Sequence, residues 1–167
     1  MKFRKPDHRI DAPIIFVHPA DEAWDTEALN KSFKEHGKDC PWLVYCTGQS
    51  RFDLGPVQHF LKGSPVEFHG RRLDAIELNE ITALWEREAV QGFPRARASV
   101  LKSLRLCLTK VERDGTSLVD LERPGDLTNA DVQTLTDSFD EGIEVLRLVG
   151  NAFFQASKPL SDAEKKR

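Results

Sequence analysis

The stretch FDEGIEVLRLVGNAFFQA, residues 139–156, carries the clearest helical pattern in the 167-residue sequence. Its charged and amide side chains fall on one side of a helical projection, and its large apolar side chains fall on the other. The apolar stripe is formed by Ile143, Leu146, Val149 and Phe153, and it is widened by Val145 and Ala152. Such a stripe predicts that this helix covers a hydrophobic core, for which the rest of the chain must supply the opposite surface.

Two glycines, Gly142 and Gly150, interrupt this helix near its apolar stripe. Because glycine costs about 1 kcal/mol of helix propensity relative to alanine, we expect both to allow the close approach of another element. The adjacent phenylalanines differ, since Phe153 lies on the stripe and Phe154 is rotated to its margin. We therefore predict that Phe153 is core, and that Phe154 contacts a protein partner together with Leu160, if the chain folds back beyond the helix.

Short strands are expected in the first 70 residues. The runs that indicate them are PIIFV at 13–17, WLVYC at 42–46 and PVEFH at 65–69. They are rich in β-branched and aromatic residues, and in the last run Val66 and Phe68 should share one face. A short helix is expected between the first two runs, with Asp25 or Thr26 as its N-cap and Gly37 as its end.

The sequence beyond residue 79 predicts mostly helix. Asn79 can cap one amphipathic helix, and a second is expected from Pro94 to about Val111 because proline favours the first turn of a helix. In the turn-rich segment that follows, Asp114-Gly115 is the signal for a small hairpin.

These segments together predict an α+β fold, with short strands in the N-terminal 70 or so residues and a helical C-terminal half. Thr128 and Asp131 form a capping signature that opens the C-terminal helical region. We expect an extended basic arm at 1–12, a single α+β domain at 13–157 and a mobile charged tail at 158–167.

Composition argues against several classes of protein. The net charge of −3 gives no general attraction to nucleic acid or to an anionic membrane. The longest uncharged stretch of the first half, residues 40–50, is about half the length of a membrane span. The basic N-terminus lacks the apolar segment of a signal peptide. The three cysteines are irregularly spaced, which does not indicate a disulfide framework, and Cys107 among leucines is expected to be a small core residue.

The stretch LVYCTGQSR, residues 43–51, is the one that suggests catalysis. A strand that leads to Cys46, followed after four residues by Arg51, resembles the active-site loop of rhodanese-like sulfurtransferases. The resemblance covers nine residues and implies Cys46 as the persulfide-forming nucleophile and Arg51 as the anion-binding group. A loop of backbone amides can lower the pKa of a thiol and so supports such chemistry.

No metal ion or cofactor is expected from the sequence. The five histidines are scattered, and Cys40 and Cys46 are too widely spaced for a zinc knuckle. The chain also contains no H-E-x-x-H motif, glycine-rich phosphate loop or dinucleotide fingerprint.

Basic side chains gather on one face of the helix expected from Pro94. They are Arg95, Lys102, Arg105 and Lys110. Residues 94–113 hold six basic side chains and one acidic one, whereas residues 128–156 hold five acidic side chains and one basic one. We favour the interpretation that the two segments neutralise each other. The alternative is that the basic face contacts the phosphates of a nucleic acid, although no aromatic residues interleave it for base stacking.

The order of features from residue 65 onward resembles a known protein family. The segments are PVEFHGRRLDAIELNEITALWERE, RASVLKSLRLCLTKVE and LRLVGNAFFQASKPLSDAEKKR. They give a short strand and an arginine pair, followed by two amphipathic helices and an apolar final helix. This order of elements is similar to that of the small tail-assembly chaperones and minor structural proteins of tailed bacteriophages. The resemblance implies a mixed domain that works through protein–protein contacts and has no catalytic residues.

The leading hypothesis is therefore a non-enzymatic bacteriophage assembly protein or minor virion protein that uses no cofactor. It would bind other tail or head proteins, or a second copy of itself, in the host-cell cytoplasm or in the virion. Two alternatives stay open, namely a sulfurtransferase that uses Cys46 and a nucleic-acid-binding adaptor that uses the basic face. No contact with a membrane is expected.

Overall fold

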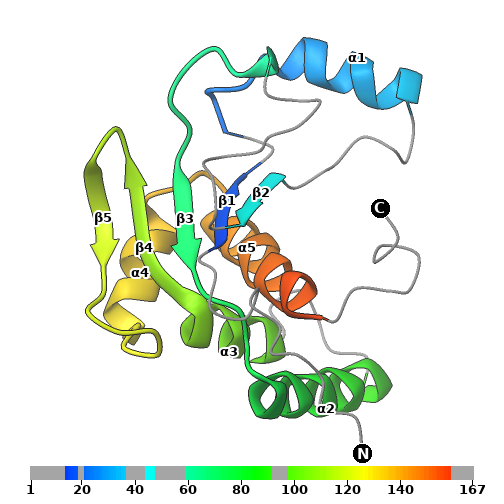
Figure 1. Ribbon diagram of the computed structural model, residues 1–167, viewed down its shortest axis with the longest axis vertical. Helices are drawn as coiled ribbons and strands as arrows, with labels where there is room; N and C mark the ends of the chain where they lie inside the picture. Colours follow the sequence, from blue (N-terminus) through cyan, green and yellow to red (C-terminus); the bar gives the residue numbers. More distant parts are fainter. Residues whose placement is uncertain (1–13, 19–20, 37–43, 48–58, 92–97, 159–167) are drawn as a thin grey trace, which may run out of the picture.

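The computed structural model describes residues 14–18, 21–36, 44–47, 59–91 and 98–158 (Figure 1). Its elements in chain order are β1 (Ile14–Val17), α1 (Thr26–His36), β2 (Val44–Thr47), β3 (Glu67–Gly70), α2 (Ala75–Gln91), α3 (Ala98–Cys107), β4 (Leu108–Arg113), β5 (Thr116–Asp120), α4 (Asn129–Asp137) and α5 (Gly142–Ser157). The expected arm at 1–12, and the expected tail except for Lys158, lie outside the described residues.

Five strands form one antiparallel sheet in the order β2-β1-β3-β4-β5 (Figure 1). Strand β1 lies between β2 and β3, and its Phe16 is directly opposite Phe68. Strands β1, β2 and β3 arise from the three runs predicted in the first 70 residues, and Val66 and Phe68 are both buried as expected. The predicted α+β class is confirmed.

Helices α3, α4 and α5 pack together and enclose the core against one face of the sheet (Figure 1). The fully buried side chains at this interface are Ile14, Phe16, Phe68, Leu108 and Val111 from the sheet and Leu104, Leu135, Leu146, Val149 and Phe153 from the helices. Helix α2 packs against α3 at the end of this layer. None of the described helices has both the length and the apolar composition that a membrane span needs.

Helix α3 is shorter than predicted, because the chain changes from helix to strand between Cys107 and Leu108. The spacing of Leu104, Leu108 and Val111 fits a continuous helix, but in the structure Leu108 and Val111 are buried from strand β4. The hairpin signal decides this segment, since Asp114 and Gly115 have the positive φ angles of 50° and 76° that a tight hairpin turn requires. The prediction of helix as far as Val111 is therefore wrong, and the small hairpin is confirmed.

Side-chain caps define the described starts of three helices. The capping box of Thr128 and Asp131 is present at α4, as predicted. Helix α2 begins four residues before the predicted cap at Asn79, because Asp74 accepts hydrogen bonds from the backbone N–H groups of Ile76 and Glu77. At α1, Asp25 accepts a hydrogen bond from the backbone of residue 28, which settles the choice between Asp25 and Thr26.

A buried carboxylate supports the start of α3. Glu88 of α2 is 8% exposed and accepts hydrogen bonds from the backbone N–H groups of Ala98 and Ser99, and from the hydroxyl of Ser99. A negative charge at a helix N-terminus is favourable because it satisfies the free N–H groups there. Glu88 therefore joins α2 to α3 in a way that the sequence pattern does not reveal.

Helix α5 buries a face rotated slightly from the predicted one. Leu146, Val149 and Phe153 are at most 1% exposed, but Ile143 at the start of the predicted stripe is 56% exposed. The two glycines allow the close approach that was expected. A Cβ at Gly150 would lie 2.5 Å from the backbone oxygen of residue 100 on α3, and one at Gly142 would collide with the carbonyl group of residue 136.

Candidate functional site

A broad groove of about 890 Å³ lies where the β4–β5 hairpin, the α4–α5 connection and the segment after β1 meet. Its apolar part consists of Val66, Phe68, Leu118, Phe139 and Val145. Phe68 and Phe139 pack with ring centroids 5.7 Å apart, whereas Leu118 is 43% exposed. The groove therefore offers an accessible apolar surface with a firmly packed base.

One wall of the groove is fixed by Asp21, whose carboxylate is 4% exposed. Its two oxygens accept hydrogen bonds from the backbone N–H groups of Ala23 and Val66, at 2.8 Å and 2.9 Å. Arg113 at the end of β4 lies 3.2 Å from both oxygens and 2.6 Å from Glu22. These contacts join the turn after β1 to β3 and β4, so this wall of the groove is preorganised.

The groove has a negative rim. Its charged lining consists of Asp21, Glu22, Asp114, Asp140, Glu141 and Arg113. The hydrogen bond that Arg113 donates to Glu22, followed by the charge of Asp21, raises the pKa of Arg113, so this cation is neutralised by two of the carboxylates. Within the described residues, no ion pair neutralises Asp114, Asp140 or Glu141. A cationic ligand is therefore the favoured occupant.

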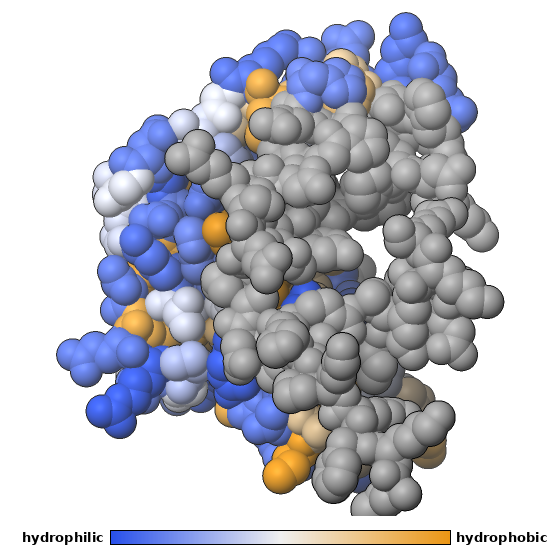
Figure 2. Space-filling view, in the orientation of Figure 1, coloured by the Kyte–Doolittle hydropathy of each residue, from blue (hydrophilic) through white to orange (hydrophobic). Residues whose placement is uncertain are grey.

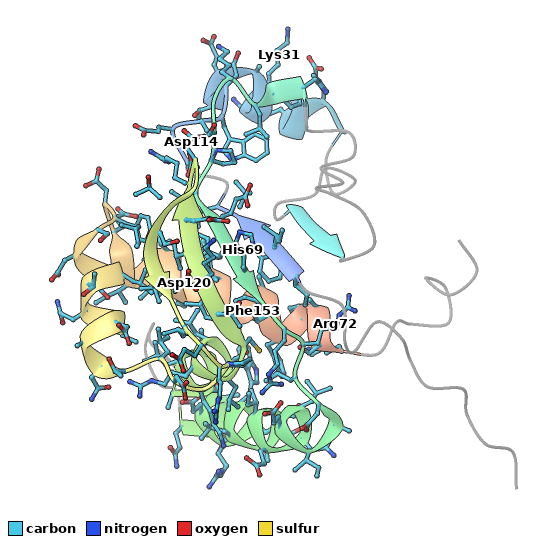
Figure 3. The ribbon with its side chains drawn as sticks, turned by 60° about the vertical axis from the view of Figure 1, so that its left-hand side comes forward. Lys31, His69, Arg72, Asp114, Asp120 and Phe153 are labelled. Carbon is cyan, nitrogen blue, oxygen red and sulfur yellow. The ribbon has the colours of Figure 1, made fainter. Side chains whose placement is uncertain are left out.

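Backbone strain also falls on this rim. Among the described residues, the two non-glycine residues with positive φ are Asp114, at 50°, and Glu141, at 55°. Both line the groove, and Figure 3 shows Asp114 at the tip of the β4–β5 hairpin. Aspartate tolerates this conformation in a hairpin turn, but glutamate at the start of α5 has no such local reason. Strained residues that hold a loop in one shape are common at binding sites.

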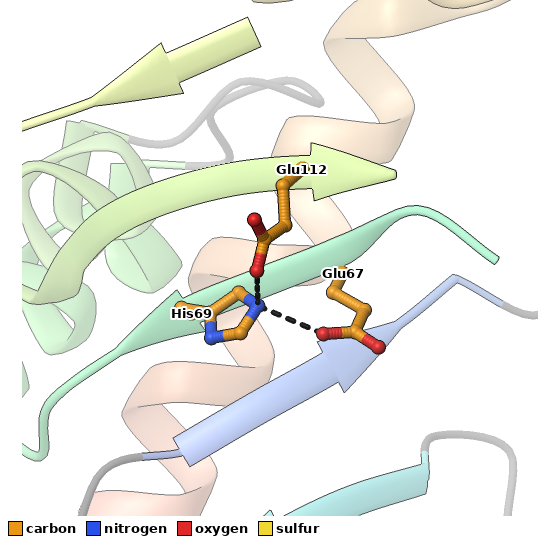
Figure 4. Close-up of side chains that lie close together, drawn as sticks. All are labelled: Glu67, His69 and Glu112. Atoms are coloured by element: carbon orange, nitrogen blue, oxygen red, sulfur yellow. Dashed lines mark ion pairs between the residues drawn. The ribbon is translucent and has the colours of Figure 1, made fainter. Parts of the chain in front are cut away.

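A second group of ionisable side chains lies on β3 and β4 (Figure 4). The Nε2 atom of His69 is 2.9 Å from Glu67 and 3.2 Å from Glu112, and Lys110 is 2.5 Å from the other oxygen of Glu112. The hydrogen bond from Lys110 lowers the pKa of Glu112. These residues alternate with Phe68 and Val111, which face the core, so the group lies on the opposite face of the sheet.

The predicted partner-contacting residue Phe154 is not on the surface. It is 3% exposed, and its ring stacks on Trp85 of α2 with centroids 5.6 Å apart and an interplanar angle of 14°. The ammonium group of Lys158 lies 4.5 Å from the ring centroid. The prediction for Phe154 is therefore wrong, because α2 covers the margin of α5 that the helical projection left open. Leu160 lies outside the described residues.

The predicted phosphate-contacting residues do not share one helical face. Lys102 on α3 pairs with Glu80 at 2.8 Å, and Arg105 on α3 contacts Asn129. Lys110 is on β4, where it pairs with Glu112 rather than extending the face of α3. Arg95 lies outside the described residues. The prediction of a continuous basic helix face with Lys110 is wrong, because the helix ends three residues earlier.

The residues of the sulfurtransferase alternative are only partly placed. Cys46 is in strand β2, where it is opposite Ile15 of β1. Arg51 and the segment that would form the catalytic loop lie outside the described residues. The structure therefore leaves this alternative as a prediction.

The third cysteine gives a direct test of the core. Burial raises the pKa of the Cys107 thiol to about 12, and the side chain is fully buried, as the sequence predicted. Because the thiolate is the reactive form, we expect Cys107 to remain unmodified by iodoacetamide at pH 8 in the folded protein and to react in urea. Peptide mass spectrometry measures this, and alkylation of Cys107 at the same rate in both conditions would contradict its burial.

Comparison of the chain with protein-family models, with curated proteins and with solved structures finds no match.

Sequence reasoning missed both the groove and the histidine–carboxylate group. The groove combines residues from the turn after β1, the β4–β5 hairpin and the start of α5, which are far apart in the chain. The alternation of Glu67 and His69 around a buried Phe68 was a usable signal for a polar group on one face of a strand. Their partner Glu112 directly follows the segment predicted as helix to about Val111, and this prediction concealed its position beside them.

Proposed function

We propose that this protein is a non-enzymatic binding protein whose groove holds a basic, partly apolar segment of a partner protein. In the setting that the sequence resemblance implies, the partner is a tail or head protein of a bacteriophage, and binding keeps that protein competent for assembly. The observation that carries the proposal is the pairing of an exposed apolar surface with three un-neutralised rim carboxylates in one groove.

The chemistry of the groove selects the occupant. Leu118 and Phe139 offer contact to an aliphatic or aromatic side chain, and burying such a side chain contributes about 1.5–3 kcal/mol. Asp114, Asp140 and Glu141 surround this surface, so lysine or arginine residues beside the apolar anchor are attracted and acidic segments are repelled. Figure 2 shows that the described surface in its view is mainly hydrophilic, with apolar residues in small groups.

A pair of peptides tests this selectivity. We expect a fluorescein-labelled peptide of alternating lysine and leucine to bind with an affinity that falls as salt is added, and the matched glutamate–leucine peptide not to bind. The double variant Asp140→Lys, Glu141→Lys should bind the lysine peptide at least about tenfold more weakly, which corresponds to about 1.4 kcal/mol. Fluorescence anisotropy measures both affinities.

The control for this experiment is the double variant Glu86→Lys, Glu122→Lys, which reverses the same number of charges at exposed residues outside the groove. It should leave the affinity within about twofold, since remote surface charges are screened. Equal binding of the two peptides, or an equal loss in this control, would show that general charge attraction rather than the groove holds the peptide.

Co-expression tests the partner class directly. Each virion protein encoded beside this chain is expressed with the wild type and with Leu118→Asp, which places a charge on the exposed apolar wall. We expect one of these proteins to co-purify with the wild type and to be lost from the variant. Retention of that protein by Leu118→Asp, or a monomeric wild type that holds none of them, would reject the proposal.

A further inference from the structure

The group formed by Glu67, His69 and Glu112 has the composition and geometry of a metal site. We propose that it binds one divalent transition-metal ion of the Zn²⁺ class. The three ligand atoms, one imidazole nitrogen and two carboxylate oxygens, all lie within 4.8 Å of one another. Figure 4 shows the three side chains converging from two adjacent strands.

The sheet fixes the positions of all three side chains. Glu67 and His69 are two residues apart on β3 and therefore project from the same face. Glu112 on β4 is directly opposite Glu67 in the antiparallel register. Residues on paired strands are held more rigidly than residues on loops, so little rearrangement is needed to bring the ligand atoms to one ion.

The hydrogen bonding of His69 is unusual for a simple ion pair. Its Nε2 atom is shielded from solvent and lies close to two carboxylate oxygens, yet no hydrogen bond of acceptable geometry is formed with any described residue. A hydrogen placed on Nε2 would therefore point at neither Glu67 nor Glu112. A ligand nitrogen in a metal site likewise faces the neighbouring ligand atoms without donating a hydrogen bond to them.

The separations of the ligand atoms are close to those around a zinc ion. Zinc binds nitrogen and oxygen at about 2.0–2.2 Å in a tetrahedron, so neighbouring ligand atoms around one ion are roughly 3.3–3.6 Å apart. The two distances from Nε2 of His69 are 2.9 Å to Glu67 and 3.2 Å to Glu112, so both carboxylates have to move outward slightly to admit an ion. The side chains of the three residues are 18–30% exposed, so the group borders solvent although the Nε2 atom itself is shielded.

The donor set defines the class of ion. Imidazole favours zinc and other first-row transition metals, whereas Mg²⁺ and Ca²⁺ prefer all-oxygen sites. With the charge of Lys110 included, the two carboxylates leave one net negative charge beside a divalent ion. Lys110 holds the second oxygen of Glu112 at 2.5 Å, as outer-shell groups commonly hold a ligating carboxylate, and leaves the first oxygen directed at His69.

Titration of the full-length, chelator-treated protein with Zn²⁺ tests the proposal by isothermal calorimetry. We expect one ion per chain at this site and at least about tenfold weaker binding in His69→Ala and in Glu67→Gln. The second variant keeps the shape of the side chain, so it remains informative if His69→Ala folds poorly. The matched control is His59→Ala, which removes an exposed histidine outside the group and should leave the affinity unchanged.

Cobalt provides an independent readout of the ligands. The Co²⁺ complex should show visible absorption that is lost in His69→Ala, without the near-ultraviolet band of a thiolate ligand. Failure of the wild type to bind Zn²⁺, equal affinity in the wild type and both ligand variants, or a thiolate band would each overturn the proposal. The last of these results would place the ion on cysteines instead.

Discussion

Phe153→Ala should lower the free energy of unfolding by about 3–5 kcal/mol, the range expected for truncating a fully buried phenylalanine. The Phe153 side chain is fully buried and meets the ring of Phe16 edge to face, with centroids 4.8 Å apart and an interplanar angle of 79°. Its ring also occupies the space above Gly70 of β3. Truncation removes the contact between α5 and two central strands at once. Urea denaturation followed by circular dichroism measures the loss.

The matched control is Ile143→Ala on the same helix. Ile143 belongs to the stripe that the sequence predicts as core, but it is 56% exposed in the structure. We therefore expect Ile143→Ala to change the free energy of unfolding by no more than about 0.5 kcal/mol. A loss of several kcal/mol in Ile143→Ala, or a small loss in Phe153→Ala, would mean that α5 presents a different face to the sheet.

The difference between Phe153 and Ile143 shows what a helical pattern in the sequence can and cannot predict. Periodicity identifies the apolar side of α5, and Leu146, Val149 and Phe153 are buried as predicted. It does not show where the covering elements end, because that depends on α2, whose Trp85 covers Phe154, and on the α4–α5 connection, which leaves Ile143 open. The edges of the stripe are therefore set by tertiary packing.

The prediction was more accurate where a local signal, such as a helix cap or a turn, is present than where no such signal exists. Capping by Thr128 and the turn at Asp114-Gly115 are decided by adjacent residues, and both are present. In residues 104–111 the apolar spacing indicates helix, and the change to strand at Leu108 follows from the hairpin turn beyond it together with the pairing of β4 with β3. The pairing with β3 joins segments that are distant in the chain and leaves no mark in a short window of sequence.

The candidate sites depend even more on contacts between segments that are distant in the chain. The rim carboxylates Asp114, Asp140 and Glu141 are ordinary loop residues in the sequence, and only the return of α5 beneath the hairpin brings them together. Likewise, Glu112 joins Glu67 and His69 only because β4 is a strand. A single wrong assignment, helix in place of β4, was enough to hide that group and to extend the predicted basic helix face to Lys110, which lies on a strand.

Gly150→Ala should lower the free energy of unfolding by about 2–3 kcal/mol. The same substitution at an exposed position of a helix would raise it. Alanine gains about 1 kcal/mol of helix propensity over glycine, so the ordinary expectation is stabilisation. Here the new Cβ would lie 2.5 Å from the backbone oxygen of Val100 and 2.8 Å from its Cγ1 atom. The carbonyl group belongs to α3 and cannot rotate away, so α3 and α5 must separate.

Whether Gly150→Ala lowers or raises the free energy of unfolding shows whether close packing or helix propensity dominates at this position. Gln155→Ala, at an exposed position of the same helix, should remain within about 0.5 kcal/mol of the wild type in the same urea titration. If Gly150→Ala stabilises the protein, α3 and α5 do not approach as closely as described, and the burial of Leu104 and Val149 between them would need another cause. If it destabilises as expected, the glycine that weakens α5 as an isolated helix is what allows it to pack against α3.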